Sequence, residues 1–338
     1  MKAAVIKQWG SAENFELTQL PIPTLEANDV LIKVAYAGVN PADWKMRAGY
    51  LDLALPNADF PFVVGLDGSG VVVATGDEVV DFAVGDRVAT GNNIFQAGAP
   101  GSYAEYQGVN QQRIALLPDN ITLASAATLP IAGVTAWQAL FAADKGDLQQ
   151  APSKKAPNKK ILINGASGGL GSFAVQLAKW AGAEVATTCS GANLDYVKSL
   201  GADFLIDYKT QNIASELAKW APQGVDLIID AISAGSLSDP VGLLMPGGKL
   251  VNIATLTEDG DIEADMANAE RRGCKKILAF LTDESLGEDM QNLIKLVGNG
   301  QLKLPPIESF ELDDVAQAHK KLETGHVRGK LVLRVAGE

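Results

Sequence analysis

Cysteine and histidine are the scarcest chemistry-bearing residues of this sequence. Its 338 residues include two cysteines, Cys189 and Cys274, and two histidines, His319 and His326. A structural zinc site with four thiolate ligands needs more cysteine than this, so the sequence excludes one. One disulfide at most could form, and a chain of this length buries its own core without a disulfide framework. We therefore expect a reducing compartment.

Positive charge and long apolar runs are also in short supply. Lysine and arginine number 28 against 40 acidic residues, and a net charge of −12 repels phosphate backbones and anionic lipid surfaces. No apolar run approaches the roughly 20 residues of a membrane span, and the opening MKAAVI leads into a strand rather than a signal peptide. These absences predict a cytoplasmic protein with no nucleic-acid and no membrane partner.

The remaining pattern divides the chain into two parts. Up to about residue 129, short β segments such as 30–34 and 70–74 are separated by glycine, proline and aspartate, which predicts an antiparallel β domain. From residue 160, apolar strands alternate with helical stretches, which is typical of parallel βαβ units. We predict six such strands, at 161–164, 184–188, 203–206, 226–230, 249–253 and 276–281. The fold class is therefore α/β, with a six-stranded doubly wound sheet.

Two segments lie outside this scheme. Residues 144–160 are polar, contain proline and lack apolar periodicity, so we predict a surface loop. Their lysines suggest a phosphate-binding alternative, but the segment has no glycine turn that would direct amides at an anion. After residue 300 we predict a strand at 302–307, a helix at 313–323 and a strand at 330–335. This tail could complete either domain.

The strongest chemical signal is the segment ILINGASGGLG, residues 161–171. A glycine-rich turn between an apolar strand and a helix lets backbone amides approach a pyrophosphate. Against the pattern G-x-G-x-x-G the three positions are Ala166, Gly168 and Gly171, so the first departs from it. The next helix carries an apolar stripe at spacings of three and four, made of Leu170, Phe173, Leu177 and Trp180. We predict a dinucleotide site formed by Ala166, Ser167, Gly168, Gly169, Leu170 and Gly171.

The residues about 20 positions further on bear on the choice of dinucleotide. NAD-specific sites place a carboxylate there for the ribose 2′-hydroxyl, whereas this stretch, residues 187–193, reads TTCSGAN. Hydroxyl and amide groups tolerate a 2′-phosphate that a carboxylate would repel. We therefore favour NADP(H) as the cofactor, although the stretch also lacks an arginine.

An ordered set of motifs resembles one family along almost the whole chain. It comprises GVNPADWK at 38–45, GLDGSGV at 65–71, FAVGDRV at 82–88, GSYAEY at 101–106, LPIAGVTA at 129–136, the glycine turn, GAD at 201–203 with DY at 207–208, and GHVRGKLVL at 325–333. This set is similar to the zinc-free quinone oxidoreductase (zeta-crystallin-like) branch of the medium-chain dehydrogenase/reductase superfamily.

The resemblance implies a GroES-like β domain on the substrate side and an inserted Rossmann domain. We expect the first at 1–128 and 302–338 and the second at 129–301. In zinc-dependent relatives a cysteine lies near the position of Asn40 and a histidine follows the glycine equivalent to Gly65. Here Asn40, Leu66 and Asp67 stand instead. The resemblance thus implies that the catalytic metal site is missing, and that the protein is a homodimer.

Several site residues are likewise implied by the resemblance. Asn40 and Asp43 would line the nicotinamide end of the site, with Tyr50 near a family tyrosine that faces substrate, so these three are the catalytic candidates. The further cofactor candidates, with Asn40 counted again, are Thr135, Ser190, Tyr208, Ile253 and Lys330. Alternative readings stay open: Asp43 as a helix cap, Thr135 as core packing and Tyr208 as a strand-end aromatic.

The histidines and cysteines have weaker indications. His319 lies on the predicted 313–323 helix and His326 in the turn after it, and without partner cysteines we expect a solvated or capping role rather than metal binding. Cys189 and Cys274 are candidates for lowered-pKa thiols, with burial or a surface position as the alternatives.

Without zinc, saturated ketones and alcohols are hard substrates, whereas quinones and α,β-unsaturated carbonyls spread the developing charge by conjugation. We therefore expect NADPH-dependent hydride transfer to a quinone or an enal or enone, with water, relayed by Tyr50, as the proton source. The alternatives are an enoyl-thioester reductase, an NADPH-binding sensor or structural protein, and a nucleic-acid binder supported only by the lysines of 154–160.

Overall fold

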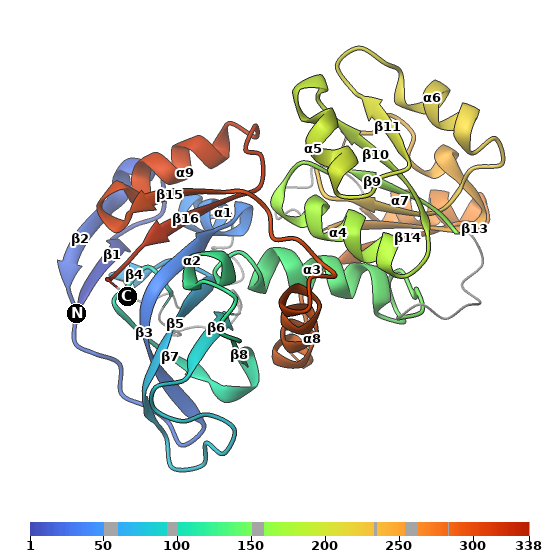
Figure 1. Ribbon diagram of the computed structural model, residues 1–338. Coiled ribbons are helices and arrows are strands. Elements are labelled where there is room, and N and C mark those ends of the chain that lie inside the picture. Colours follow the sequence, from blue (N-terminus) through green and yellow to red (C-terminus); the bar gives the residue numbers. More distant parts are fainter. Residues whose placement is uncertain are drawn as a thin grey trace. The chain divides into compact units, whose positions relative to one another are not determined.

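The chain divides into two units. The computed structural model describes residues 1–50, 60–92, 101–150, 159–232, 235–253, 262–282 and 284–337. The first unit comprises Met1–Val134, Thr282–Gly300 and Leu304–Glu338, and the second comprises Thr135–Leu281 and Gln301–Lys303 (Figure 1). The boundary falls inside helix α3 (Pro130–Phe141), between Val134 and Thr135.

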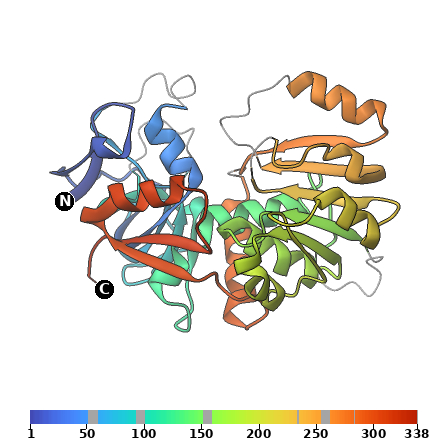
Figure 2. The same cartoon turned by 90° about the horizontal axis from the view of Figure 1, so that it is seen from above.

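The first unit is built on two β-sheets. The smaller has the order β2-β1-β4, and the larger the order β15-β16-β3-β5-β6-β8, with β7 also paired to β3. The strands are β1 (Lys2–Ile6), β2 (Phe15–Gln19), β3 (Asp29–Val39), β4 (Phe62–Val63), β5 (Asp67–Thr75), β6 (Arg87–Gly91), β7 (Tyr106–Asn110), β8 (Ile114–Leu116), β15 (Ile307–Glu311) and β16 (Lys330–Arg334). The helices are α1 (Pro41–Ala48), α2 (Leu123–Ala126), α8 (Leu286–Gly298) and α9 (Val315–Glu323), and both views show α9 beside β15 and β16 (Figures 1 and 2).

Strand pairing in the larger sheet brings distant residues together. β3 pairs antiparallel with β5, with Gly38 opposite Asp67, and β16 pairs antiparallel with β3, with Leu331 opposite Val39. The end of β3, the start of β5 and the start of β16 therefore meet. A side chain at Gly38 would place its Cβ 2.6 Å from Asp67 Oδ2, so glycine leaves the room that the Asp67 carboxylate occupies.

The second unit contains a six-stranded, fully parallel sheet. Its order is β11-β10-β9-β12-β13-β14, with strands β9 (Lys160–Asn164), β10 (Glu184–Cys189), β11 (Phe204–Asp207), β12 (Val225–Asp230), β13 (Leu244–Ile253) and β14 (Lys275–Ala279). The helices beyond α3 are α4 (Gly169–Trp180), α5 (Leu194–Ser199), α6 (Ile213–Trp220) and α7 (Ile262–Arg271). The strand order reverses between β9 and β12, which is where such sheets bind ligands at their carboxyl edge.

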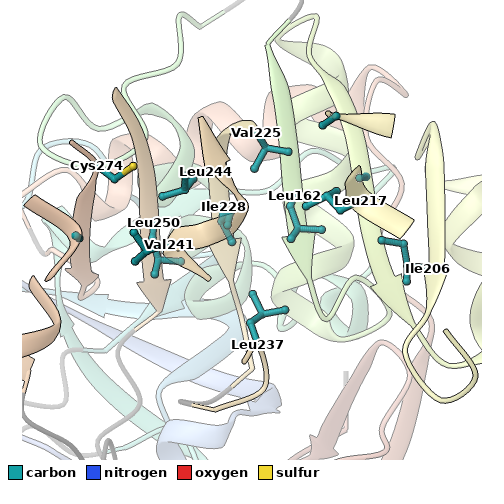
Figure 3. Packing of buried hydrophobic residues seen from close by; sticks show 13 residues of the cluster. Leu162, Ile206, Leu217, Val225, Ile228, Leu237, Val241, Leu244, Leu250 and Cys274 are labelled. Atoms are coloured by element: carbon teal, nitrogen blue, oxygen red, sulfur yellow. The ribbon is translucent and has the colours of Figure 1, made fainter. Parts of the chain in front are cut away.

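Both faces of this sheet are covered. On one face Leu162, Ile206, Ile228 and Leu250, from four strands, belong to a single buried cluster with Leu217 of α6 (Figure 3). On α4 the side chains of Phe173 and Leu177 are fully buried. Because successive strand residues point to opposite faces, a sheet covered twice requires continuously apolar strands. That requirement made the strands visible in the sequence.

The α/β class and all six predicted strands are confirmed, with their ends shifted by a few residues, most at β13, which begins at Leu244. The strand predicted at 302–307 is wrong: β15 begins only at Ile307. Pro305 and Pro306 precede it and have no N–H to donate to a ladder. Of the predicted 144–160 loop, residues 144–146 form a turn, 147–150 belong to no helix or strand, 151–158 lie outside the described residues, and Lys160 begins β9. The surface position holds only in part, because Lys145 and Leu148 are buried. Within the described part of the chain, no helix is long and apolar enough to cross a membrane.

Candidate active site

The glycine turn follows β9 and begins α4 in the second unit, as the sequence predicts. Gly165 adopts φ +87°, a left-handed conformation that favours glycine, and its amide donates to Thr188 Oγ1 at 3.0 Å. Gly168 is the N-cap of α4 and offers no side chain to the first amides of the helix. Those amides have no intrahelical acceptor and remain available to an anion.

Two of the later glycines of the turn, Gly168 and Gly171, serve different purposes. A Cβ on Gly171 would lie 2.2 Å from the carbonyl oxygen of Gly165, so this glycine lets helix and turn pack closely. A Cβ on Gly168 would have its nearest neighbour, the same oxygen, at 3.7 Å. Gly168 is therefore not needed for internal packing, and its bare backbone suits the close approach of a phosphate group. The turn fits the pyrophosphate of a dinucleotide.

A buried polar network at the carboxyl ends of three strands holds the glycine turn in place. Thr188 Oγ1 donates to Asn164 Oδ1 at 2.5 Å, and Asn164 Nδ2 donates at 2.8 Å to both Asp230 Oδ1 and Ser236 Oγ. Asn164, Thr188 and Asp230 lie at the carboxyl ends of the adjacent strands β9, β10 and β12. The network ties the turn to both neighbouring strands. Sequence reasoning missed it, although Asn164 and Asp230 each end an otherwise apolar strand.

The candidates for the adenosine end lie on the same edge of the sheet. Tyr208 N donates to Cys189 O at 3.2 Å, which brings Tyr208, 47% exposed, next to the loop that begins at Ser190. The Ser190 hydroxyl accepts from Asn193 Nδ2 at 3.2 Å. The Asp207 carboxylate, from the end of β11, faces Gly191, whose Cβ would lie 2.8 Å from Asp207 Oδ2. Sequence reasoning missed this carboxylate because it inspected only the end of β10.

Two other cofactor candidates also belong to the second unit. Ile253 is the last residue of β13 and is half-buried at the carboxyl edge. Thr135 lies on α3 and is 7% exposed. Ile253 thus shares the sheet edge with the glycine turn.

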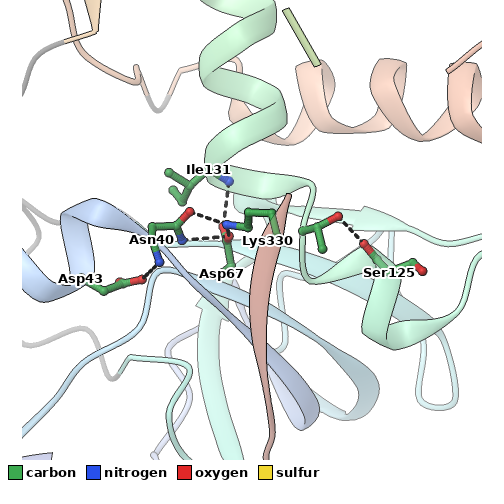
Figure 4. Close-up of polar contacts among 7 residues, drawn as sticks. Asn40, Asp43, Asp67, Ser125, Ile131 and Lys330 are labelled. Atoms are coloured by element: carbon green, nitrogen blue, oxygen red, sulfur yellow. Dashed lines mark hydrogen bonds and ion pairs between the residues drawn. The ribbon is translucent and has the colours of Figure 1, made fainter. Parts of the chain in front are cut away.

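A second cluster lies in the first unit, where β3, β5 and β16 meet. Lys330 Nζ lies 2.9 Å from Asp67 Oδ2 and 2.5 Å from Asn40 Oδ1, and Asn40 Nδ2 donates to Asp67 Oδ2 at 2.8 Å (Figure 4). The other oxygen, Asp67 Oδ1, accepts from the amide of Ile131 at 2.7 Å. Lys330 is 4% exposed and Asp67 fully buried, so the ammonium and carboxylate form a buried ion pair.

Asp43 adjoins this cluster on the first turn of α1. Its Oδ2 accepts from the amide of Asn40 at 2.7 Å, which confirms a helix-capping bond, while its buried Oδ1 has no hydrogen-bond partner among the described residues. Burial raises the pKa of Asp43 to about 7, and the nearby Asp67 carboxylate adds to the rise. Asp67 has Lys330 as its counter-ion. Asp43 therefore holds a proton more readily than an ordinary carboxyl group.

His319 does not match its expected solvated or capping role. Together with Val315 and Ala318 it forms the buried face of α9, and its Nε2 lies 3.1 Å from the Tyr103 hydroxyl. Burial, and secondarily the Arg47 charge, lowers the pKa of His319 to about 3. The i, i+3, i+4 spacing of these three residues was the available signal. His326 is exposed.

The remaining candidates stand apart from these clusters. Tyr50 is 53% exposed and makes an edge contact with Trp44 at 5.9 Å between ring centroids. It follows the C-terminal end of α1, an eight-residue helix of about 12 Å that begins beside Asn40. Both cysteines are buried, and burial raises the pKa of Cys189 to about 11, so the lowered-pKa interpretation is wrong for Cys189.

No group of three His, Cys, Asp or Glu side chains is placed to hold a metal ion in the described ranges. Asn40, near whose position the family resemblance implies a cysteine ligand in zinc-dependent relatives, contacts an ammonium group and a carboxylate.

Comparison with known proteins places this geometry in a family. Residues 26–119 match the alcohol dehydrogenase GroES-like domain and residues 200–333 the zinc-binding dehydrogenase family. Over 326 residues the chain is 35% identical to the chloroplastic quinone-oxidoreductase QR1 of Triphysaria versicolor, covering 96% of this chain and 95% of that protein. The chain belongs to the zinc-free quinone oxidoreductase branch of the medium-chain dehydrogenase/reductase superfamily. The protein is therefore an oxidoreductase with a GroES-like domain and a Rossmann-like parallel sheet.

Two further comparisons agree with this family assignment. The chloroplastic NADPH-dependent alkenal/one oxidoreductase of Arabidopsis thaliana is 33% identical over 342 residues, with 98% of this chain and 79% of that protein covered. The solved structure of the quinone oxidoreductase from Coxiella burnetii superposes with a TM-score of 0.86 at 32% identity and 99% coverage of both chains. The relatives support a nicotinamide cofactor and a small-molecule acceptor.

Proposed function

We propose that this oxidoreductase transfers hydride from NADPH to a quinone or to the β-carbon of an α,β-unsaturated aldehyde or ketone, without a metal ion. One observation carries the proposal: Asn40 is held by Lys330 and Asp67 where zinc-dependent relatives have a metal ligand. Amide N–H groups can donate hydrogen bonds to a developing oxyanion. Such donors suffice where conjugation spreads the charge, whereas saturated carbonyls need a stronger electrophile.

The residues of the first unit would act on the acceptor. Asn40 would donate a hydrogen bond to the acceptor oxygen. Asp43 holds a proton more readily than an ordinary carboxyl group, and in its neutral form it would place no negative charge near that oxygen. Tyr50, exposed on its turn, is the candidate to relay a proton from water. Lys330 contacts Asn40 directly. The family resemblance also implies a contact between Lys330 and the cofactor, and this contact remains part of the proposal.

The residues of the second unit would hold the cofactor. NADPH, when bound, supplies the hydride. The amides from Ala166 to Gly171 would bind its pyrophosphate, Thr135 would lie against the nicotinamide, and Ile253 would line the same sheet edge. This assignment is supported by the uncapped start of α4 and by the open space at Gly168.

The preference for NADPH over NADH rests on the loop after β10. Ser190 and Tyr208 would contact the 2′-phosphate, and the name of the Arabidopsis alkenal/one relative supports NADPH. The Asp207 carboxylate faces Gly191 and would disfavour that phosphate. However, it already accepts from Lys209 N at 3.0 Å and Thr210 Oγ1 at 3.1 Å within its own turn. Fluorescence titration with both reduced cofactors tests the preference, and tighter NADH binding would overturn it.

The remaining parts of the proposal rest on the family resemblance and, for the compartment, on the composition. We assign substrate binding to residues 1–128 and 302–338 and cofactor binding to 129–301. We also propose a homodimer in the cytoplasm. Sedimentation velocity and localisation of a tagged chain test these two points.

One screen separates the proposed reaction from its alternatives. NADPH oxidation is followed at 340 nm with quinones, enals, enones, an enoyl thioester and saturated aldehydes. We expect turnover with the conjugated acceptors and little with the saturated aldehydes. Turnover confined to the thioester would identify an enoyl-thioester reductase, and NADPH binding without any turnover would indicate a sensor or structural protein. Either result would overturn the proposal.

A further inference from the structure

The contacts around Asn40 define the orientation of its amide group by chemistry alone. A lysine ammonium only donates hydrogen bonds, so the amide atom beside Lys330 Nζ is the oxygen. An ionised carboxylate only accepts, so the atom beside Asp67 Oδ2 is the nitrogen. Exchanging the two amide atoms would set like groups against each other at both contacts. The amide therefore has a single favourable orientation.

In this orientation one of the two N–H groups of the Asn40 side chain has no acceptor among the described residues. The Asn40 nitrogen carries two hydrogens, and Asp67 accepts one of them at 2.8 Å. Because the amide group is planar, fixing the first N–H also fixes the direction of the second. In addition, Lys330 withdraws electron density from the amide oxygen, which strengthens the N–H as a donor because hydrogen bonds in a chain polarise one another.

A buried ion pair is a weak means of stabilising a fold. Removing two charges from water costs about as much as their attraction returns, and apolar replacements are often equally stable. The pair nevertheless lies at the meeting point of three strand ends, with Lys330 4% exposed and Asp67 fully buried. Asp67 is also fixed independently through its bond from the Ile131 amide. The arrangement is better explained by the geometry it imposes on Asn40.

We propose that Lys330 and Asp67 are positioning residues that fix and polarise the Asn40 amide, so that its nitrogen donates to the oxygen of the reducible carbonyl group. This inference rests on the proposed function and adds how the chain replaces the electrophile of its zinc-dependent relatives. Lys330 and Asp67 act through Asn40, and only Asn40 touches the substrate.

A double-mutant cycle tests whether Lys330 acts through Asn40. The variants are Asn40→Ala, Lys330→Met and the double variant, assayed for kcat with one quinone at saturating NADPH. We expect Asn40→Ala to lower kcat by about 100-fold, as removal of an oxyanion donor does. Lys330→Met should lower it by at least about tenfold, because a misplaced group loses most of its effect. In the Asn40→Ala background, Lys330→Met should cause almost no further loss.

A second readout separates positioning from a purely structural role. Across a series of quinones with electron-withdrawing and electron-donating substituents, loss of the oxyanion donor should lower kcat most for the electron-rich quinones. Lys330→Met and Asn40→Ala should therefore steepen the dependence of log kcat on the substituent constant to a similar degree. Assays at saturating NADPH keep any change in cofactor affinity out of this comparison.

Two further variants serve as a fallback and as a control. Lys330→Met leaves Asp67 without its counter-ion, so Lys330→Met/Asp67→Asn, which removes both charges, provides the test if the single variant does not fold. Lys276→Met, on β14, breaks another Lys–Asp pair, in which Asp265 of α7 lies 2.8 Å from the Lys276 ammonium. This variant should leave kcat and the substituent dependence unchanged.

The outcomes distinguish this inference from the proposed function. If the wild type reduces quinones or enones but the losses from Lys330→Met and Asn40→Ala simply multiply, Lys330 acts independently and the inference is overturned alone. An unchanged substituent dependence in Lys330→Met would overturn it as well. If the wild type oxidises NADPH with none of the conjugated acceptors, the proposed function is overturned, and the inference with it.

Discussion

The hydroxyl group of Tyr103 lies 3.1 Å from His319 Nε2, and both side chains are fully buried. The contact joins residues 216 positions apart and is flanked by the ring of Phe15, 4.8 Å from the imidazole between centroids. With a pKa of about 3, His319 is neutral at physiological pH. It acts as a hydrogen-bonded core residue, and its burial makes the stability of the protein depend on pH.

We predict that His319 destabilises the fold progressively in acid. Its pKa is about 3 in the folded chain and 6.5 in the reference state, so between these values the unfolded chain binds one more proton. The free energy of unfolding should therefore fall as the pH falls from 6.5, by up to about 1.4 kcal/mol per pH unit. His319→Gln keeps a hydrogen-bonding group without this titration and should lack that contribution in urea unfolding at pH 4 to 7. The exposed His326→Gln is the control, and identical slopes in all three proteins would contradict the prediction.

Asp43 should contribute with the opposite sign. Its pKa is about 7 in the folded chain against 3.8 in the reference state, so in this interval the folded chain holds a proton that the unfolded chain has released. Stability from this group is present below pH 3.8 and is lost as the pH rises through 7. Asp43→Asn keeps an acceptor for the Asn40 amide and cannot ionise. Relative to the wild type it should gain stability between pH 5 and 8, as measured by urea unfolding. A pH-independent difference would count against a buried, neutral Asp43.

The second unit could be predicted from sequence because its signals are local. Each parallel strand is a short apolar run, and strand, glycine turn and helix follow one another directly, from Lys160 to Trp180. The strand predicted at 302–307 failed for an equally local reason, because two prolines were counted as part of an extended run.

The site in the first unit depends on long-range register instead. Lys330 meets Asp67 from 263 positions away and Asn40 from 290. Nothing in a single sequence fixes how β16 aligns with β3, so the ion pair could not be foreseen, even though the family resemblance singled out Asn40 and Lys330 separately. The burial of His319 likewise depends on Tyr103, which lies in the bend before β7.

Removal of metal ions should leave the activity intact. The proposed chemistry uses the Asn40 amide as electrophile, so neither EDTA nor 1,10-phenanthroline should change the rate of quinone reduction by more than measurement error. Elemental analysis of the active protein should find less than about 0.1 zinc per chain, in contrast to the one catalytic zinc of a metal-dependent dehydrogenase. Inhibition that added zinc reverses would contradict this expectation.

Asn164 should couple the stability of the second unit to cofactor binding. Asn164→Leu keeps the size of the side chain but removes the bonds to Thr188, Asp230 and Ser236. Because buried polar groups lose their partners, we expect the free energy of unfolding to fall by about 2 to 4 kcal/mol. NADPH binding should weaken at least about tenfold, since Thr188 also holds the Gly165 amide. Asn120→Ala, which removes one exposed bond to Gly298 O, should change neither quantity by much.

The glycines of the turn offer the sharpest test of where the pyrophosphate binds. Gly171→Ala places a Cβ 2.2 Å from the backbone oxygen of Gly165, which cannot yield as a flexible side chain would, so the turn must open. We expect this variant to lose about 1 to 3 kcal/mol of stability together with NADPH binding. Gly168→Ala places its Cβ 3.7 Å from the nearest atom and should fold with nearly the wild-type melting temperature.

If phosphate groups approach the bare backbone at Gly168, the added methyl group keeps them at a distance, and the NADPH dissociation constant of Gly168→Ala should rise at least about tenfold without a loss of stability. Calorimetric titration beside thermal unfolding of both variants measures the two effects separately. Wild-type NADPH affinity in a well-folded Gly168→Ala protein would mean that the pyrophosphate does not lie over this glycine. The first turn of α4 would then have to bind it from its other side, through Gly169 and Leu170.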